Sequence, residues 1–296
     1  MPRLDRTGAT AGPAGSAPIA SLIDGRPGET VPSWDRGLSY GDGLFETVLV
    51  HRGAPCQWPR HCTRLLLGCR RLGIAEPPAA LLEAEVRRLI AGLDEAVLKV
   101  LITRGVGGRG YRPQPAAEPR RILHLYPAPN YPAAWRQSGV VVRFCRTPTS
   151  YNPALAGLKH LNRLDNVLAR AEWDDPEIAE GLLSGMDGEI VGGTMTNLFL
   201  WDGRTLATPA LDRCGIAGTV RALTLELARA CGIPCTVADT RREALVRMPG
   251  LFLTNSLVGA WPVRRLEERE LDPTRLPLEL LEAVNRESRG AGGAGA

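Results

Sequence analysis

The sequence predicts an α+β protein of two domains, a smaller N-terminal one and a larger C-terminal one. Its 296 residues suffice for two domains of ordinary size, and a hydrophobic content of 44% supplies their cores. In the first part, strand-like segments are followed by two helical segments and then by strands, the order of an α+β domain. The proline-rich segment "PAPNYPAAWRQ" at 127–137 then reads as a linker. We expect domains at about 21–126 and 138–290, with flexible tails at 1–20 and 291–296.

The smaller domain is expected to open with two short strands around the turn Asp24-Gly25. A longer strand follows in "LFETVLVHRGAPCQW" and is broken by a second turn at Arg52-Gly53. The segment "RHCTRLLLGCRRLGI" places apolar residues three and four apart, which predicts a helix that ends at Gly73. A second helix at 78–92 and strands in "VLKVLITRG" and "RILHLYP" complete this domain.

The larger domain is expected to begin with a strand in "GVVVRFCRT", followed by a helix that carries Lys159. Strands are expected from about 178 to 208, a helix at about 218–231, and a strand in "GLFLTNS". Because ligands often bind where two domains meet, we expect a site built from residues of both.

The composition argues against several classes of function. The net charge of +4 is modest and the basic residues are scattered, so no nucleic-acid partner is expected. The seven cysteines form neither a CxxC pair nor a pattern spaced with histidines, so no metal site is expected. Cysteine usage of this kind and the lack of a signal peptide favour a cytoplasmic protein. No apolar run is long enough to span a membrane.

One lysine stands out in the segment "AGLKHLNRLDNVLARAEW". Only two of the 36 lysine and arginine residues are lysines, Lys99 and Lys159. An arginine stays protonated in a protein, whereas a lysine can lose its proton and form a Schiff base with an aldehyde. Lys159 is therefore a candidate nucleophile, and the alternative is an ordinary surface lysine at the start of a helix.

If Lys159 reacts with an aldehyde, pyridoxal phosphate is the simplest partner, and its phosphate needs a binding site of its own. In "CGIAGTVRALTLELA", Gly218 and Thr219 lie where a helix begins and leaves backbone N–H groups free. Ser256 ends the strand in "FLTNS", and Arg64 on the first long helix offers a bidentate charge. Ordinary helix capping is the alternative interpretation of the Gly-Thr pair.

These segments carry a resemblance to a known family. The chain resembles the fold-type IV pyridoxal-phosphate enzymes, which include branched-chain and D-amino acid aminotransferases and 4-amino-4-deoxychorismate lyase. The similar segments span nearly the whole ordered chain and occur in the family's order: "DRGLSYGDGLFETV" at 35–48, "HCTRL" at 61–65, "ITRGVGGRGY" at 102–111, "GLKHLNRLDNVLARAE" at 157–172, "TNLFL" at 196–200, "CGIAGTVR" at 214–221 and "FLTNS" at 252–256. The forms "KHLNRL" and "TRGVGGRGY" are similar to those of the lyase.

The resemblance implies a D-amino acid aminotransferase-like fold, a homodimer and a role for each matching residue. Lys159 would carry pyridoxal 5'-phosphate and move protons. The phosphate would be bound by a set of residues at element ends: Arg64, Gly218, Thr219, Val220 and Ser256. Tyr40 and Arg109 would face the substrate.

The chain departs from the family pattern at Gly192. Five residues before the asparagine of "NLF", the family carries a glutamate that pairs with the pyridine nitrogen of the cofactor; counting back from Asn197 gives Gly192. Glu189 lies three residues upstream, on the opposite face of a strand, and only a bulge at Gly192-Gly193 would let it substitute. A carboxylate there keeps the ring protonated as an electron sink.

Three functions follow as alternatives. The first is a 4-amino-4-deoxychorismate lyase, which forms an aromatic ring and therefore depends less on the electron sink than transamination does. The second is a D- or branched-chain amino acid aminotransferase, disfavoured by Gly192 and by "KHLNRL". The third is a non-catalytic or repurposed homologue, which only Gly192 favours.

Overall fold

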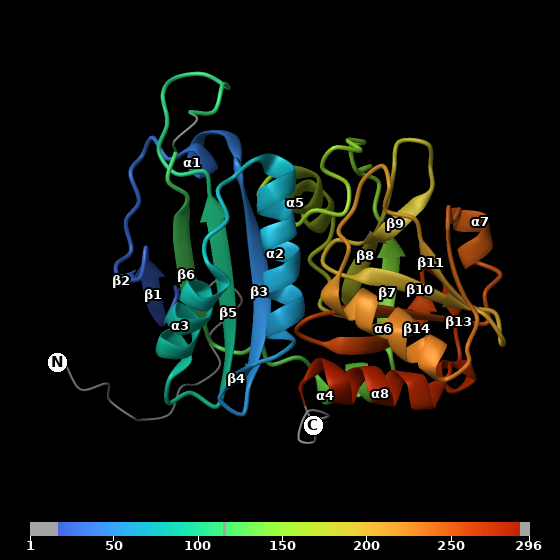
Figure 1. The fold of residues 1–296 in the computed structure, drawn as a ribbon. Helices are drawn as coiled ribbons and strands as arrows, with labels where there is room; N and C mark the ends of the chain where they lie inside the picture. The colour runs from blue at the N-terminus through green and yellow to red at the C-terminus, as the bar shows by residue number, and fades with distance from the viewer. Residues whose placement is uncertain (1–16, 115–116, 291–296) are drawn as a thin grey trace.

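The structure, a computed structural model, describes residues 17–114 and 117–290 and consists of two halves, each built on its own sheet (Figure 1). Most of the tails expected at 1–20 and 291–296 lies outside the described residues, but residue 20 already begins the first strand. Among the helices of these two ranges, none combines the length and the apolar character needed to cross a membrane.

The first half holds a six-stranded antiparallel sheet in the order β2-β1-β6-β5-β3-β4. Its strands are β1 (Ala20–Ile23), β2 (Arg26–Pro27), β3 (Gly43–His51), β4 (Ala54–Pro55), β5 (Glu95–Thr103) and β6 (Arg120–Tyr126). The long strands β3 and β5 pair along their whole length, from Gly43 opposite Thr103 to His51 opposite Glu95. This pairing makes β3 a rigid support for residues that point away from the sheet.

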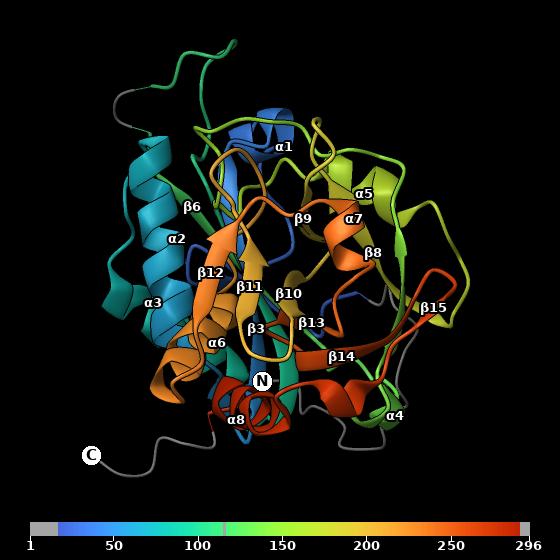
Figure 2. The ribbon, with the colours of Figure 1, turned by 90° about the vertical axis from the view of Figure 1, so that its right-hand side faces the viewer.

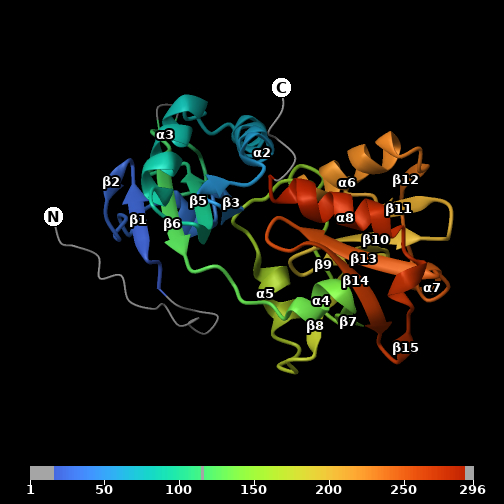
Figure 3. The same ribbon diagram turned by 90° about the horizontal axis from the view of Figure 1, so that it is seen from below.

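Two helices cover one face of this sheet, α2 (Trp58–Leu72) and α3 (Ala79–Ile90) (Figure 3). Apolar side chains of both helices, among them Leu65 and Leu82, form one core with the strands. Helix α2 ends at Gly73, whose φ of 62° is a left-handed conformation that glycine adopts without strain. The short helix α1 (Arg36–Tyr40) precedes β3.

The second half holds a nine-stranded mixed sheet in the order β12-β11-β10-β13-β14-β7-β8-β9, with β15 paired to β14. Its strands are β7 (Val140–Phe144), β8 (Ile178–Ser184), β9 (Ile190–Gly193), β10 (Asn197–Trp201), β11 (Leu206–Pro209), β12 (Cys235–Ala238), β13 (Gly250–Asn255), β14 (Gly259–Leu266) and β15 (Arg269–Glu270). Three pairings are parallel, β11 with β12, β14 with β7 and β7 with β8.

Helices pack on both faces of this second sheet (Figure 2). On one face, α6 (Thr219–Ala230) and α8 (Leu278–Ser288) bury Val220 and Leu280 against the sheet. On the other, α7 (Arg242–Leu245) and the residues around α4 (Ala133–Gln137) close a second core. The remaining helices are α5 (Leu164–Arg170) and the 3-10 turn η1 (Pro273–Arg275).

Most of the expected elements are confirmed, and two differ from expectation. The final part of the segment expected as a linker forms α4, which seats Trp135 against Trp261 with ring centroids 5.1 Å apart. The helix expected to carry Lys159 begins only at Leu164, because the backbone around Lys159 is bonded to neighbouring strands instead of to itself. The domain boundaries expected from the sequence stay a proposal.

Candidate active site

A cavity of about 350 Å³ lies where the two halves meet, and Lys159 is part of its wall. The first half contributes side chains from β3 and α2, and the second contributes the ends of β9, β10 and β13 and the start of α6. Five of the residues expected to hold the cofactor besides Lys159 line it: Arg64, Gly218, Thr219, Val220 and Ser256. Gly192 lines it as well. Arg64 and Ser256, which are far apart in the sequence, therefore meet at one cavity.

Lys159 lies on an extended segment bonded to both halves. Its carbonyl accepts from Phe45 N at 2.9 Å, on β3 of the first sheet. Gly157, two residues earlier, donates to Gly215 O and accepts from Ala217 N, each at 3.0 Å, in the second half. Because the backbone is fixed on both sides, the point from which the Lys159 side chain enters the cavity is fixed too.

Burial in the cavity disfavours the charged form of the Lys159 amine. Burial lowers its pKa from 10.5 to about 7, and the positive charge of Arg64 acts in the same direction. Its Nζ stands 4.1 Å from the centre of the Phe45 ring, and Nζ of Lys99, the other lysine, is 5.4 Å from the same ring. A substantial part of the Lys159 amines is therefore neutral near pH 7, which a nucleophile requires.

Arg64 is held by a buried ion-pair network. Its Nε donates to Glu46 Oε1 at 2.7 Å, its Nη2 donates to Glu46 Oε2, and its Nη1 donates to Ala217 O at 2.8 Å. His61 Nδ1 bonds Glu46 Oε2 at 2.6 Å, and both Glu46 and His61 are buried. A guanidinium has five N–H donors, so two remain for an anion in the cavity.

The start of α6 forms the opposite side of this anion site. Its N-cap is Gly218, without a side-chain cap, so the first N–H groups, those of Thr219 and Val220, stay available. A Cβ on Gly218 would come within 2.0 Å of Asn197 Oδ1, so this position requires glycine. Ser256 Oγ bonds Thr47 O at 2.6 Å, and the buried hydroxyl of Thr254 has no hydrogen-bond partner among the described residues. Polar groups of this kind fit a bound phosphate.

No carboxylate lines the cavity within the described part of the chain. Glu189 does not take the place of the family glutamate: Tyr151 Oη donates to its carboxylate, and Arg213 Nη2 pairs with it at 3.3 Å. An irregularity in the pairing of β8 with β9 lies between Ile190 and Gly192, and it leaves Glu189 outside the cavity. The departure noted at Gly192 therefore persists in three dimensions.

Glu180, on β8, organises the turn beside Gly192. Its carboxylate is fully buried and accepts five hydrogen bonds, from Gly181 N, Thr194 N and Oγ1, Met195 N and Thr196 Oγ1, at 2.6 to 3.1 Å. All of these bonds belong to the β9–β10 turn or to Gly181 next to Glu180 itself. Glu180 is thus engaged in shaping the cavity wall and has no free edge for a ligand.

Tyr40 and Arg109, the residues expected to face the substrate, are not among the residues that line the cavity. Gly110 N donates to Tyr40 Oη at 3.2 Å, which places the Arg109 loop against α1, and Arg109 itself is exposed. The expected contact of Tyr40 and Arg109 with the substrate therefore stays a prediction.

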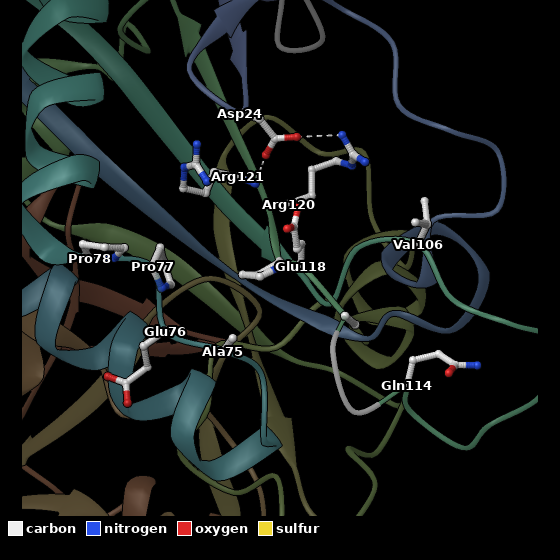
Figure 4. Close-up of a pocket in the computed structure, with 12 residues that line it drawn as sticks. Asp24, Ala75, Glu76, Pro77, Pro78, Val106, Gln114, Glu118, Arg120 and Arg121 are labelled. Atoms are coloured by element: carbon white, nitrogen blue, oxygen red, sulfur yellow. Dashed lines mark hydrogen bonds and ion pairs between the residues drawn. The ribbon is translucent and has the colours of Figure 1, made fainter.

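A larger hollow of about 1090 Å³ lies on the first sheet, away from Lys159 (Figure 4). Three of its charged pairs are Arg120 with Asp24 at 2.8 Å, Arg121 with Glu85 at 3.0 Å and Glu76 with Arg70 at 2.7 Å. It offers no counterpart to the reactive amine and the free N–H groups of the Lys159 cavity.

Sequence reasoning missed Glu46, His61 and Arg163. Glu46 and His61 hold Arg64, and Arg163 lines the cavity beside Lys159. A signal for Glu46 was present in "LFETV", where a single charge interrupts an apolar strand, since buried charges are rarely tolerated without a function or a partner.

The comparisons with known proteins agree with this geometry. A family model described as amino-transferase class IV matches residues 43–266. The crystal structure of 4-amino-4-deoxychorismate lyase from Pseudomonas aeruginosa is 45% identical, with a TM-score of 0.84 over 90% of this chain and 99% of that chain. Aminodeoxychorismate lyase from Vibrio harveyi is 32% identical over 248 residues, which are 84% of this chain and 92% of that protein.

A more distant structure shares the fold alone. Branched-chain aminotransferase from Thermoproteus uzoniensis is 18% identical, with a TM-score of 0.81 over 93% of this chain and 96% of that chain. The predicted two-domain α+β fold is confirmed, with a small antiparallel sheet and a larger mixed sheet. This chain belongs to the class IV aminotransferase family, the fold-type IV group of pyridoxal-phosphate enzymes.

Proposed function

We propose that this chain is a 4-amino-4-deoxychorismate lyase, which converts aminodeoxychorismate to 4-aminobenzoate and pyruvate with pyridoxal 5'-phosphate. One observation carries the proposal: a lysine with a pKa of about 7 shares a cavity with an anion site, in a chain 45% identical to a lyase. The similarity extends over 99% of that enzyme, which supports proposing its whole activity for this chain.

The residues present fit the cofactor. The two free N–H groups of Arg64 and the N–H groups of Thr219 and Val220 suit a phosphate, and the orphaned Thr254 hydroxyl shows that the cavity holds unsatisfied polar groups. Lys159 would bind the aldehyde carbon. Gly192, which lines the same cavity, would offer the cofactor no carboxylate.

The chain's residues then have the following tasks. Pyridoxal phosphate, when bound, supplies an electron-withdrawing ring conjugated to the substrate's nitrogen. The amine of Lys159 would accept the proton from the ring carbon of the substrate that carries the substrate's nitrogen. The carbon–oxygen bond to the enolpyruvyl group breaks, the substrate ring becomes aromatic, and Lys159 returns a proton to the departing enolpyruvate, which gives pyruvate.

The test is release of pyruvate from aminodeoxychorismate by the protein loaded with pyridoxal phosphate, without any added keto acid. We expect pyruvate and 4-aminobenzoate in equal amounts, because a lyase needs no amino acceptor. Turnover that requires a keto acid, with no pyruvate formed from aminodeoxychorismate, would show an aminotransferase instead.

Replacing Gly192 by glutamate tests why this chain does without the acidic residue. We expect Gly192→Glu to raise transamination of amino acids by about tenfold or more, with a smaller effect on pyruvate release, because aromatisation already drives the lyase reaction. A Cβ at position 192 would approach Thr196 O to 2.9 Å, so the turn must shift, and Gly192→Ala controls for that shift. An equal rise of both activities would contradict this explanation.

We further propose that the protein is a homodimer that forms through α1 and α5. Leu38 on α1 is 69% exposed, Leu164 and Val167 on α5 are 74% and 59% exposed, and all three line one hollow on the surface. Exposed apolar patches of this kind mark interaction sites. In a two-fold dimer the same patch pairs with itself, so α1 of one copy, with Tyr40 and the Arg109 loop behind it, would reach the cavity rim of the other.

The dimer proposal predicts that Leu164→Glu produces a monomer. A charge placed in a buried apolar interface is expensive, whereas Leu81→Glu, on α3 and away from this face, should leave the dimer intact. The measurement is sedimentation velocity of the loaded protein and both variants. A wild-type monomer at micromolar concentration, or a Leu164→Glu dimer, would refute the interface.

A further inference from the structure

Arg163 is a half-buried cation in the wall of the Lys159 cavity that forms no ion pair with a carboxylate of the described residues. It follows Lys159 by four residues and lies where three hollows meet: the Lys159 cavity, the hollow beside Asp165, and the apolar hollow between α1 and α5. A side chain at such a junction is within reach of a group bound beside Lys159.

All partners of the Arg163 guanidinium in the described chain are neutral. Its Nε donates to His160 O at 3.1 Å, its Nη2 donates to His160 Nε2, and its Nη1 reaches Asn166 Oδ1 only at 3.5 Å. His160 is neutral, because burial lowers its pKa to about 4. Burial lowers the pKa of Arg163 to about 10 and outweighs the negative charge of Asp165, which acts in the opposite direction.

The nearby carboxylates are engaged elsewhere. Asp165 accepts from Ser150 N at 2.8 Å and from Thr149 Oγ1 at 3.3 Å. Glu46 is bound to Arg64 and His61. The guanidinium has used three of its five donors, and one N–H on each terminal nitrogen remains, which is the pair that a bidentate oxyanion takes. Burying such a charge is costly unless an anion joins it.

We propose that Arg163 is an anion-binding residue of the active site and that it receives a negatively charged oxygen beside Lys159. The inference rests on the proposed lyase function for its two sources of that oxygen: the ring carboxylate of the substrate, or the phenolic oxygen of the cofactor. In either case the guanidinium gains the counter-ion that the folded chain does not give it and fixes the orientation of the group next to the Lys159 amine.

The first arm of the test compares a carboxylate with its amide. The dissociation constants of 4-aminobenzoate and 4-aminobenzamide are measured on the protein loaded with pyridoxal phosphate, from the change in its visible absorption. If the substrate is the source, the wild-type protein prefers the carboxylate by about 10- to 100-fold, the amount expected for charge-assisted hydrogen bonds. Arg163→Gln then loses this preference.

The second arm compares pyridoxal phosphate with its 3-O-methyl ether, which lacks the phenolic oxygen's charge, by equilibrium dialysis against the cofactor-free protein. If the cofactor is the source, the wild-type protein prefers pyridoxal phosphate and Arg163→Gln loses that preference. Arg87→Gln, which removes the same charge from an exposed position on α3, should keep the wild-type behaviour in both arms. Arg163→Lys keeps the positive charge but not the two parallel N–H donors of the guanidinium, so it should keep part of the preference. A preference retained in this variant shows that the loss in Arg163→Gln does not come from misfolding.

Unchanged preferences in both arms for Arg163→Gln would overturn the proposal. The outcome is separable from the lyase assignment. Suppose that the wild-type protein releases no pyruvate from aminodeoxychorismate, and that Arg163→Gln abolishes the preference for the carboxylate or for the phenol. That result would refute the lyase function and leave Arg163 as an anion-binding residue.

Discussion

Replacing Lys159 by arginine lowers pyruvate release by at least about three orders of magnitude, as expected for the loss of a group that both forms the covalent bond and moves the proton. Arginine keeps the positive charge and much of the length, but its guanidinium cannot lose a proton near neutral pH. The loss therefore separates chemistry from charge. The measurement is the turnover number of the loaded variant with aminodeoxychorismate.

Lys99→Arg is the matched control, because Lys99 is the other lysine of the chain and approaches the same Phe45 ring. It should keep activity within about tenfold, since its positive charge is preserved. The pKa of Lys159 adds a pH test: attachment of the cofactor needs the neutral amine, so its rate should rise as the pH increases through about 7. A Lys159→Arg variant with near wild-type turnover would refute the assigned role.

Replacing Glu46 by glutamine has the second large effect, on stability and on cofactor binding together. Glu46 is buried between Arg64 and His61, and breaking a buried pair leaves an uncompensated cation, which costs about 3 kcal/mol of unfolding free energy. Because Arg64 loses the carboxylate that orients it, the affinity for pyridoxal phosphate should fall by about tenfold or more. Urea unfolding and equilibrium dialysis measure the two effects.

Glu76→Gln is the control for Glu46→Gln. It removes the exposed ion pair between Glu76 and Arg70, which lies at the end of α2, the helix that also carries Arg64. This substitution should change the free energy of unfolding by less than about 1 kcal/mol and leave the cofactor affinity unaltered. Equal effects of the two substitutions would contradict the network's role.

The pH dependence of the free energy of unfolding is an independent test of the role of Glu46. Burial alone would raise the pKa of Glu46, but Arg64 and His61 outweigh it and lower the pKa from 4.5 to about 2. A carboxylate whose pKa is lower in the folded state contributes stability above its unfolded pKa. That contribution is therefore complete above about pH 4.5 and is lost as the pH falls towards 2. The wild type should lose this stability in acid, and Glu46→Gln should not.

The helices and strands were predictable where glycines and turn residues mark their ends in the sequence. Gly73 ends α2 as expected, the Asp24-Gly25 turn joins β1 and β2, and α6 begins after Gly218. The region of Lys159 was mispredicted because the apolar spacing of α5 suggests a helix that starts earlier. Tertiary hydrogen bonds to β3 and to Gly215 hold that segment extended instead, and such bonds leave no local pattern.

The members of the candidate site were predictable mainly through the resemblance, and their mutual support was not. Glu46 and Arg64 are 18 residues apart on a strand and a helix, so their pairing depends on how α2 packs on the sheet. The lack of a counter-ion for Arg163 likewise follows from where Asp165 and Glu46 point in the folded chain. A sequence shows that charges are present and not which of them are neutralised.

The central claim is that Lys159 holds pyridoxal phosphate in a cavity that no carboxylate of the described residues lines. The most direct measurement is to incubate the protein with the cofactor, record its visible spectrum, reduce it with borohydride and identify the modified lysine by mass spectrometry, beside Lys159→Ala. With two lysines in the chain, the assignment is unambiguous. The account predicts a band that borohydride bleaches and one phosphopyridoxyl group on Lys159, both absent from the variant. No band, or modification of Lys99 instead, would contradict the claim and favour a cleft put to another use.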